Sequence, residues 1–173
     1  MALSLYDASV PVFIRGLGQL SFLLEKGLAH AQSTGIDPTT LVNARLAPDM
    51  FTLAGQIQSA SDASKFGAAR LAGITGPSFP DTETTYEELL ARVNKTVDFL
   101  KSVDRALIDS AESRTVTIKT RGNEVQFTAQ NYLLQFALPN FMFHIVTAYG
   151  ILRHNGVPVG KLDFLGRFET SAS

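Results

Sequence analysis

The feature that most constrains the fold is a stripe of apolar residues that recurs at spacings of three and four in four long segments. An α-helix has 3.6 residues per turn, so this spacing gathers the apolar side chains on one face. Such helices bury that face against one another, and four of them predict a mainly all-α, antiparallel four-helix bundle. The first segment, residues 5–32, shows the stripe most clearly, with Val10, Phe13, Leu17, Leu20, Leu24 and Leu28.

Two further helices are predicted in the middle of the chain. Pro48 suits the first turn of a helix that ends near Gly73. Its inner face is rich in small residues and comprises Leu53, Ala54, Ile57, Ala60, Ser64, Ala68 and Leu71. The next helix starts at Asp81 or Thr82, where oxygen acceptors and acidic residues favour a helix N-terminus. Its inner stripe comprises Tyr86, Leu89, Leu90, Val93, Val97, Leu100, Asp104 and Leu107, and its expected outer residues are Arg92, Lys95 and Lys101.

The apolar period changes to two between Thr115 and Phe127, with a turn at residues 121–123, and this pattern predicts a β-hairpin. A two-stranded ribbon is marginal alone, so we expect it to lie against one end of the bundle. The last helix is predicted over residues 129–155, interrupted or restarted at Pro139, because proline lacks the backbone N–H of a helix interior. We expect one domain over residues 1–168 and a disordered tail over residues 169–173.

Composition excludes several classes of function. Of the 173 residues, 45% are hydrophobic and 18% charged, and the formal net charge is -1, which argues against a disordered chain and against a nucleic-acid partner. The absence of cysteine excludes disulfides, thiolate metal sites and a cysteine nucleophile. No apolar run approaches the roughly 20 residues of a membrane-spanning helix, and the first 20 residues do not read as a signal peptide. We therefore expect a soluble, cytoplasmic protein without a membrane partner.

One arrangement in the last predicted helix suggests chemistry. Asn140, His144, Thr147 and Ile151 share its inner face at spacings of four, three and four, which places an imidazole inside the bundle. Such a residue is either a core histidine satisfied by one hydrogen bond, or a ligand-binding group or general acid and base. The side chains that can face it from the second helix are Asp49, Gln56 or Asp62, and the sequence leaves open which of them points inward.

A metal site at His144 lacks a second ligand. A chelating pair on one helix needs positions i+3 or i+4, and these hold Thr147 and Ala148. His154 lies about 15 Å further along the axis at a rise of 1.5 Å per residue, and His30 is expected at the surface or the boundary of the core. Neither a nucleophile-elbow motif nor a phosphate-binding loop is present. We therefore expect no bound metal and no cofactor.

Several blocks of the sequence are characteristic of a known family. On these blocks the chain resembles the DUF1993 family, whose function is uncharacterised and which is grouped with the DinB/YfiT-like bundles. The resemblance implies an up-down-down-up four-helix bundle, often dimeric, whose better-known relatives hold a divalent metal with three histidines. The blocks are Asp49-Met50, Gln56, residues 70–73, 139–141, 143–144, 147–149 and 151–156, Gly160-Lys161 and residues 163–166.

This sequence departs from the metal-binding pattern of those relatives. His144 matches the first histidine of their H-x-x-x-H pair on the last helix, but Ala148 occupies the second position. Gln56 or a neighbour stands where the resemblance implies a histidine on the second helix. Because two of three imidazoles are missing, the hydrolase and thiol-transferase chemistry of the metal-bearing relatives is not carried over.

Two hypotheses place function in the bundle interior. In the first, the chain is a metal-free bundle that binds an unknown small molecule in a pocket near His144. The binding residues would be Gln56, Asn140, Thr147 and Tyr149. In the second, the same pocket belongs to an enzyme, in which His144, polarised by Asp62 or Asp49, moves protons in an isomerisation, cyclisation or dehydration without a cofactor, or with assistance from a metal.

A third hypothesis needs no pocket. In it the chain is a structural protein that forms a homodimer, and exposed apolar helix faces serve only assembly. A homodimer is expected under the first two hypotheses as well, from the family resemblance. The sequence does not decide whether the chain is an enzyme, and no residue names a substrate.

Overall fold

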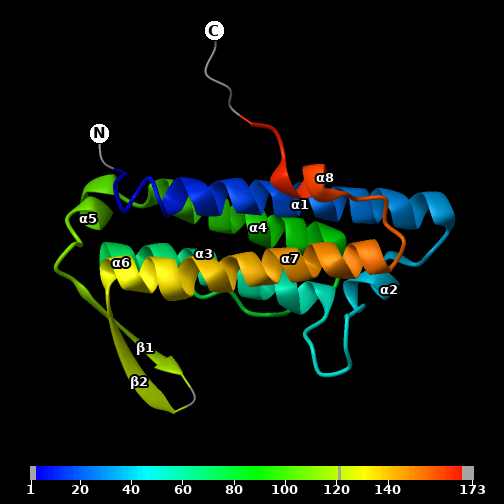
Figure 1. Ribbon diagram of the computed structural model, residues 1–173. Coiled ribbons are helices and arrows are strands. Elements are labelled where there is room, and N and C mark those ends of the chain that lie inside the picture. The colour runs from blue at the N-terminus through cyan, green and yellow to red at the C-terminus, as the bar shows by residue number, and fades with distance from the viewer. Residues whose placement is uncertain (1–2, 121, 169–173) are drawn as a thin grey trace, which may run out of the picture.

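The computed structural model describes residues 3–120 and 122–168 and has four long helices side by side. Figure 1 shows that α1 and α7 run in one direction and that α3 and α4 run in the opposite direction. α3 packs against both α4 and α7, and α1 closes the bundle by packing against the same two helices. The predicted mainly all-α bundle with a small hairpin is confirmed. The long helices are α1 (Val10–Thr34), α3 (Leu53–Ala72), α4 (Tyr86–Ser102) and α7 (Leu138–His154).

Short elements connect the long helices. The two strands pair antiparallel, with Val116 opposite Phe127 and Ile118 opposite Val125. This hairpin extends from the end of the bundle where α5 and α6 lie (Figure 1), and it immediately precedes the last helical run, as predicted. The short elements are α2 (Pro38–Val42), α5 (Arg105–Asp109), β1 (Thr115–Thr120), β2 (Asn123–Thr128), α6 (Ala129–Asn131), the π-helix η1 (Tyr132–Ala137) and α8 (Lys161–Leu165).

Capping residues set the helix boundaries and correct two of the predicted starts. α3 begins at Leu53 rather than Pro48, because the Thr52 hydroxyl accepts the Gly55 N–H at 3.2 Å. α4 begins at Tyr86 rather than near Thr82, because Thr85 and Glu88 form a reciprocal capping box. α4 also ends earlier, at Ser102. Asp104 is therefore not an inner residue: it is exposed and caps α5.

The last helical run is continuous from α6 through η1 to α7, so Pro139 neither interrupts nor restarts it. In η1 the Leu138 N–H bonds to the Leu133 carbonyl, five residues earlier, which is π-helical winding. This wider turn lies directly before Pro139. A proline ring in an α-helix collides with the carbonyl four residues before it, and the wider turn relieves that collision.

The bundle interior is close-packed where α1 crosses α7. Gly16 lies against Phe141, and the Phe13 and Phe141 rings meet edge to face with centroids 5.1 Å apart. A Cβ on Gly16 would lie 2.6 Å from Phe141, closer than carbon atoms can approach. Among the described residues, no helix is long and apolar enough to cross a membrane. The disorder predicted for residues 169–173 falls outside the described residues.

A cluster of charged side chains, here called the Arg92 network, ties α3 and α4 to the crossover segment 73–85. Contrary to the prediction that Arg92 faces outward, it is only 2% exposed. Its Nη2 bonds to Asp62 and to Asp81, each at 2.9 Å, and its Nη1 donates to Glu83 at 3.0 Å. Lys65, also buried, bonds to Asp62 and lies between the Phe66 and Phe79 rings, 4.4 and 4.5 Å from their centroids.

Two glycines on α1 test the helix contact. Gly16→Ala should lower the free energy of unfolding by about 1–3 kcal/mol, because the added methyl group overpacks against Phe141. Gly18→Ala is the matched control: a Cβ there has no neighbour within 4 Å, so the better helix propensity of alanine should raise stability by about 0.5–1 kcal/mol. Urea denaturation measures both. Equal effects at the two positions would contradict the close packing of Gly16 against Phe141.

The Arg92 network makes a second prediction. Arg92→Met should lower the free energy of unfolding by about 1–3 kcal/mol, because it leaves Glu83, whose side chain is only 13% exposed, without its cation and frees Asp81 from the bundle. Lys95→Met, on the exposed face of the same helix, should change stability by less than about 0.5 kcal/mol. If both variants unfolded at the same urea concentration, the network would not hold the crossover segment.

Candidate functional site

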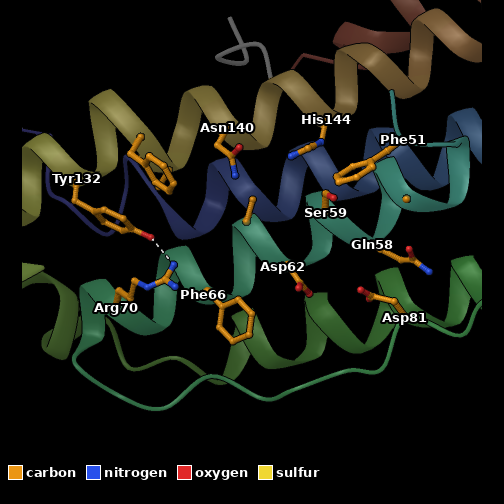
Figure 2. Close-up of a pocket in the computed structure, with 14 residues that line it drawn as sticks. Phe51, Gln58, Ser59, Asp62, Phe66, Arg70, Asp81, Tyr132, Asn140 and His144 are labelled. Atoms are coloured by element: carbon orange, nitrogen blue, oxygen red, sulfur yellow. Dashed lines mark hydrogen bonds between the residues drawn. The ribbon is translucent and has the colours of Figure 1, made fainter. Parts of the chain in front are cut away.

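A cavity of about 410 Å³ lies between α3 and the continuous helix formed by η1 and α7. Its size suits a small organic molecule. Figure 2 shows Tyr132, Asn140 and His144 on one side, with Ser59 and Arg70 facing them from α3, while Asp62 and Phe66 project from the other side of α3. The residues that line this α3–α7 cavity are Phe51, Gly55, Gln58, Ser59, Asp62, Ala63, Phe66, Arg70, Asp81, Tyr132, Phe136, Ala137, Asn140 and His144.

The π-helix keeps one row of side chains directed into the cavity. Tyr132, Phe136, Asn140 and His144 are each four residues apart, and in a regular α-helix every such step turns about 40° past a full turn. Three steps would carry the row well around the helix. The slower winding of η1 compensates for part of this drift, so all four side chains line the cavity. Tyr132 and Phe136 consequently stack, with ring centroids 5.8 Å apart.

His144 is held by one specific hydrogen bond. Its Nδ1 lies 2.8 Å from Oε1 of Gln56 on α3. The amide group of Gln56 donates through Nε2 to the Phe51 carbonyl at 3.4 Å, so its oxygen is the atom that meets the imidazole. That oxygen can only accept, and Nδ1 must therefore carry the proton. The Nε2 atom of His144 is left with a lone pair, and no other described side chain bonds to it.

Burial lowers the pKa of His144 below its ordinary value. The imidazole is therefore neutral at pH 7, with Nδ1 as donor and Nε2 as acceptor. In this state a histidine can accept a hydrogen bond from a ligand or remove a proton from it.

Arg70 marks the other end of the cavity. Its Nη1 donates to the Tyr132 hydroxyl at 3.0 Å, which Figure 2 shows as a dashed line. The guanidinium carbon lies 5.6 Å from the centroid of the Phe66 ring and 6.0 Å from that of Tyr132, so this exposed group lies beside two aromatic rings. Burial raises the pKa of Tyr132, and its phenol is therefore a neutral hydrogen-bonding group.

The two carboxylates that line the cavity are already engaged. Asp62 bonds to Lys65 and Arg92, and Asp81 bonds to Arg92 at 2.9 Å. The proposed polarisation of His144 by Asp62 or Asp49 is therefore corrected: the neutral amide of Gln56 contacts the imidazole instead. Asp49 is exposed and lies in the segment before α3, away from the cavity lining.

The structure brings together some of the predicted site residues and separates others. His144, Asn140 and Asp62 line the cavity. Gln56 is outside the cavity lining and bonds to His144 from α3. Thr147 is buried and donates to the Phe143 carbonyl, outside the cavity lining. Tyr149 faces α8, where its ring packs 6.3 Å from that of Phe164. The expected roles of Thr147 and Tyr149 in ligand binding are therefore not supported by their positions.

Sequence reasoning missed Arg70 as a site residue. It belongs to the family block of residues 70–73, and Ser59, Asp62, Phe66 and Arg70 follow one another at spacings of three and four on α3. That periodicity is the signal that could have found this cavity wall. The sequence signal for the π-helix is weaker: it is the proline at position 139 within an otherwise helical pattern.

The cavity residues do not fit the three-histidine metal site of the better-known relatives. Of the three donor positions, one is His144, whose Nε2 keeps its lone pair, but another is Ala148, which has no donor atom, and on the facing helix the side chain that meets His144 is the amide of Gln56 and not an imidazole. Within residues 3–120 and 122–168, no group of three or more His, Cys, Asp or Glu side chains is placed to hold a metal ion. We therefore derive no chemical step through a metal.

The state of His144 makes a third prediction. Because its pKa is lower in the folded chain than in the unfolded chain, the unfolded state binds more protons as the pH falls through about 6.5. The contribution of His144 to stability is therefore complete above that pH and is lost below it. His144→Gln should remove this part of the pH dependence, which urea denaturation between pH 7.5 and 5 measures.

An NMR spectrum of the imidazole nitrogens tests the same hydrogen bond directly. The native chain should show the Nδ1–H tautomer, and Gln56→Leu should shift His144 toward the Nε2–H tautomer, which predominates in free histidine. His154→Gln, which changes an exposed imidazole at the end of α7, is the control. An Nε2–H tautomer in the native chain would contradict the assignment.

Comparison with known proteins identifies the family. The profile of the domain of unknown function DUF1993 matches residues 5–165. A crystal structure of a DinB family member protein from Shewanella denitrificans is similar over 98% of this chain and 96% of that chain, with 40% sequence identity and a TM-score of 0.88. A search of curated proteins gave no match. The chain thus belongs to the DUF1993 family and has the four-helix fold of a DinB family member.

Proposed function

We propose that this chain binds a small organic molecule in the α3–α7 cavity without a metal ion. The observation that carries the proposal is the Gln56–His144 hydrogen bond, which leaves an acceptor atom of a neutral imidazole unpaired beside an open cavity. A histidine that only packs in the core is satisfied by one hydrogen bond and need not face a cavity. A histidine that lines a cavity together with Asn140, Ser59 and a row of aromatic rings has the mixture of polar and apolar groups that is typical of ligand sites.

Enzymatic use of the same site is the alternative that the geometry favours next. The lone pair of His144 Nε2 can take a proton from a bound substrate and return it elsewhere on the same molecule, as an isomerisation, cyclisation or dehydration without a cofactor requires. Gln56 would hold the ring while the proton moves. A neutral amide stabilises the imidazolium less than a carboxylate would, so this chemistry suits a substrate whose proton is already acidic.

Two expectations from the sequence stay predictions. A homodimer would cover part of the outer face of α7, where Phe143 is 55% exposed and Val146 is 49% exposed. The cytoplasmic location also stays a prediction.

A cavity-filling variant tests the proposal. Ala63 lines the cavity, so Ala63→Phe should place a ring inside it and abolish binding. Ala29→Phe makes the same change at an exposed position of α1 and should bind as the native chain does. The measurement is ligand-observed NMR with a library of small organic fragments, on protein that has been dialysed against a chelator. Fragments that bind should also shift the Nε2 signal of His144.

The outcomes separate the possibilities. Fragments that bind the native and Ala29→Phe chains but not Ala63→Phe support the proposal. Fragments that bind all three equally, or an absence of any fragment that shifts His144, would overturn it. Binding that appears only when a divalent metal is restored would overturn the metal-free part.

A further inference from the structure

We propose that the ligand of the α3–α7 cavity is an organic acid. Arg70 binds its carboxylate, and its flat apolar body lies along the rings of Phe66, Tyr132 and Phe136. This inference rests on the proposed function and names the chemical class of its ligand. It is carried by the contrast between Arg70 and the two buried cations next to it.

The buried cations near the cavity are occupied. Lys65 bonds to Asp62, and Arg92 bonds to Asp62, Asp81 and Glu83. The carboxylates of the cavity wall are thereby engaged by cations of their own. They neither neutralise Arg70 nor repel an anion as strongly as free carboxylates would.

Arg70 is exposed, unlike those two cations, and has no such partner. It is the only cation among the described cavity-lining residues, and no described carboxylate lies within 4.0 Å of it. Its one hydrogen bond within the described part of the chain goes to Tyr132, whereas a guanidinium carries five N–H donors in a planar fork. That fork matches the two oxygens of a carboxylate, and the Tyr132 hydroxyl proton can donate to the same group.

The cavity wall between the two polar ends selects the rest of the molecule. Phe66, Tyr132 and Phe136 provide aromatic surfaces beside Arg70, which favours a flat, apolar body. At the far end His144 Nε2 is an acceptor, and Asn140 and Ser59 lie near it, so a donor group such as a hydroxyl or an amine would be bound there. Ser59 and Arg70 are about 16 Å apart along α3 at 1.5 Å per residue, and the Arg70 side chain shortens this span by pointing back toward Phe66 (Figure 2). The ligand is therefore elongated.

The experiment uses a panel of arylalkanoic acids, from phenylacetate to 6-phenylhexanoate, each beside its own uncharged primary amide. Within each pair the body is the same and only the charge differs. Affinities for the full-length native chain are measured by NMR titration at low and at physiological ionic strength. We expect at least one acid to bind ten-fold or more tightly than its amide, with a preference that weakens as salt is added.

Three variants test whether Arg70 is the group that binds the carboxylate of the ligand. Arg70→Gln should remove the preference for the acid by weakening binding of the acid far more than binding of the amide, and Arg70→Lys should restore part of the preference, since it keeps the charge but loses the fork. Arg153→Gln removes an exposed arginine outside the cavity and should retain the full preference. Circular dichroism confirms that each variant is folded.

The outcomes distinguish this inference from the proposed function. If acids and amides bind equally and Ala63→Phe abolishes both, the cavity binds ligands but the assignment of an organic acid is wrong. An acid preference that survives in Arg70→Gln would also overturn it. If no member of the panel binds, the organic-acid inference fails, and the fragment library then decides the proposed function separately.

Discussion

The structure depends on the burial of Arg92 between three carboxylates. α3 and α4 are parallel neighbours, so the chain must return along the whole bundle between them, and the crossover segment 73–85 has no regular structure of its own. The carboxylates of Asp81 and Glu83 attach this segment to Arg92, and Asp62 joins α3 to the same side chain. A buried guanidinium is costly unless it is paired, so these contacts specify one position of the crossover. The network also pairs the carboxylate of Asp62, which lines the α3–α7 cavity, with Lys65 and Arg92.

The second constraint is the way in which α7 meets α3. The π-helix directs Tyr132, Phe136, Asn140 and His144 toward one cavity, and Gln56 then fixes the imidazole by a hydrogen bond from the opposite helix. Because Gln56 accepts from Nδ1, the lone pair of His144 lies on Nε2. The cavity consequently has a neutral acceptor at one end and a guanidinium at the other. These two ends, separated by aromatic rings, are what the proposed ligand chemistry depends on.

Much of the fold could be predicted because it is encoded locally. The apolar stripe of α1, the alternation of β1 and β2, and the inner position of His144 each follow from periodicity within one segment. The errors lie where a local pattern is ambiguous or where another segment intervenes. Pro48 suits a helix start, but Thr52 caps α3; and Arg92 reads as an outer residue because its carboxylate partners lie on other elements. The same limit explains why Arg70 was not placed in the site and why Asp62 was paired with the wrong partner.

The sequence by itself determined that four amphipathic helices must share a core, that a hairpin precedes the last helix, and that an imidazole without a second histidine faces inward. These properties depend on residues three, four or two positions apart, whose relation the backbone geometry fixes. Only the tertiary structure decided that Gln56 bonds to His144 and that Arg70 has no carboxylate partner among the described residues. It also decided that Asp62, Asp81 and Glu83 form ion pairs with Arg92 or Lys65. Those relations join residues far apart in the chain, and they exist only once the helices have packed at a particular rotation and depth.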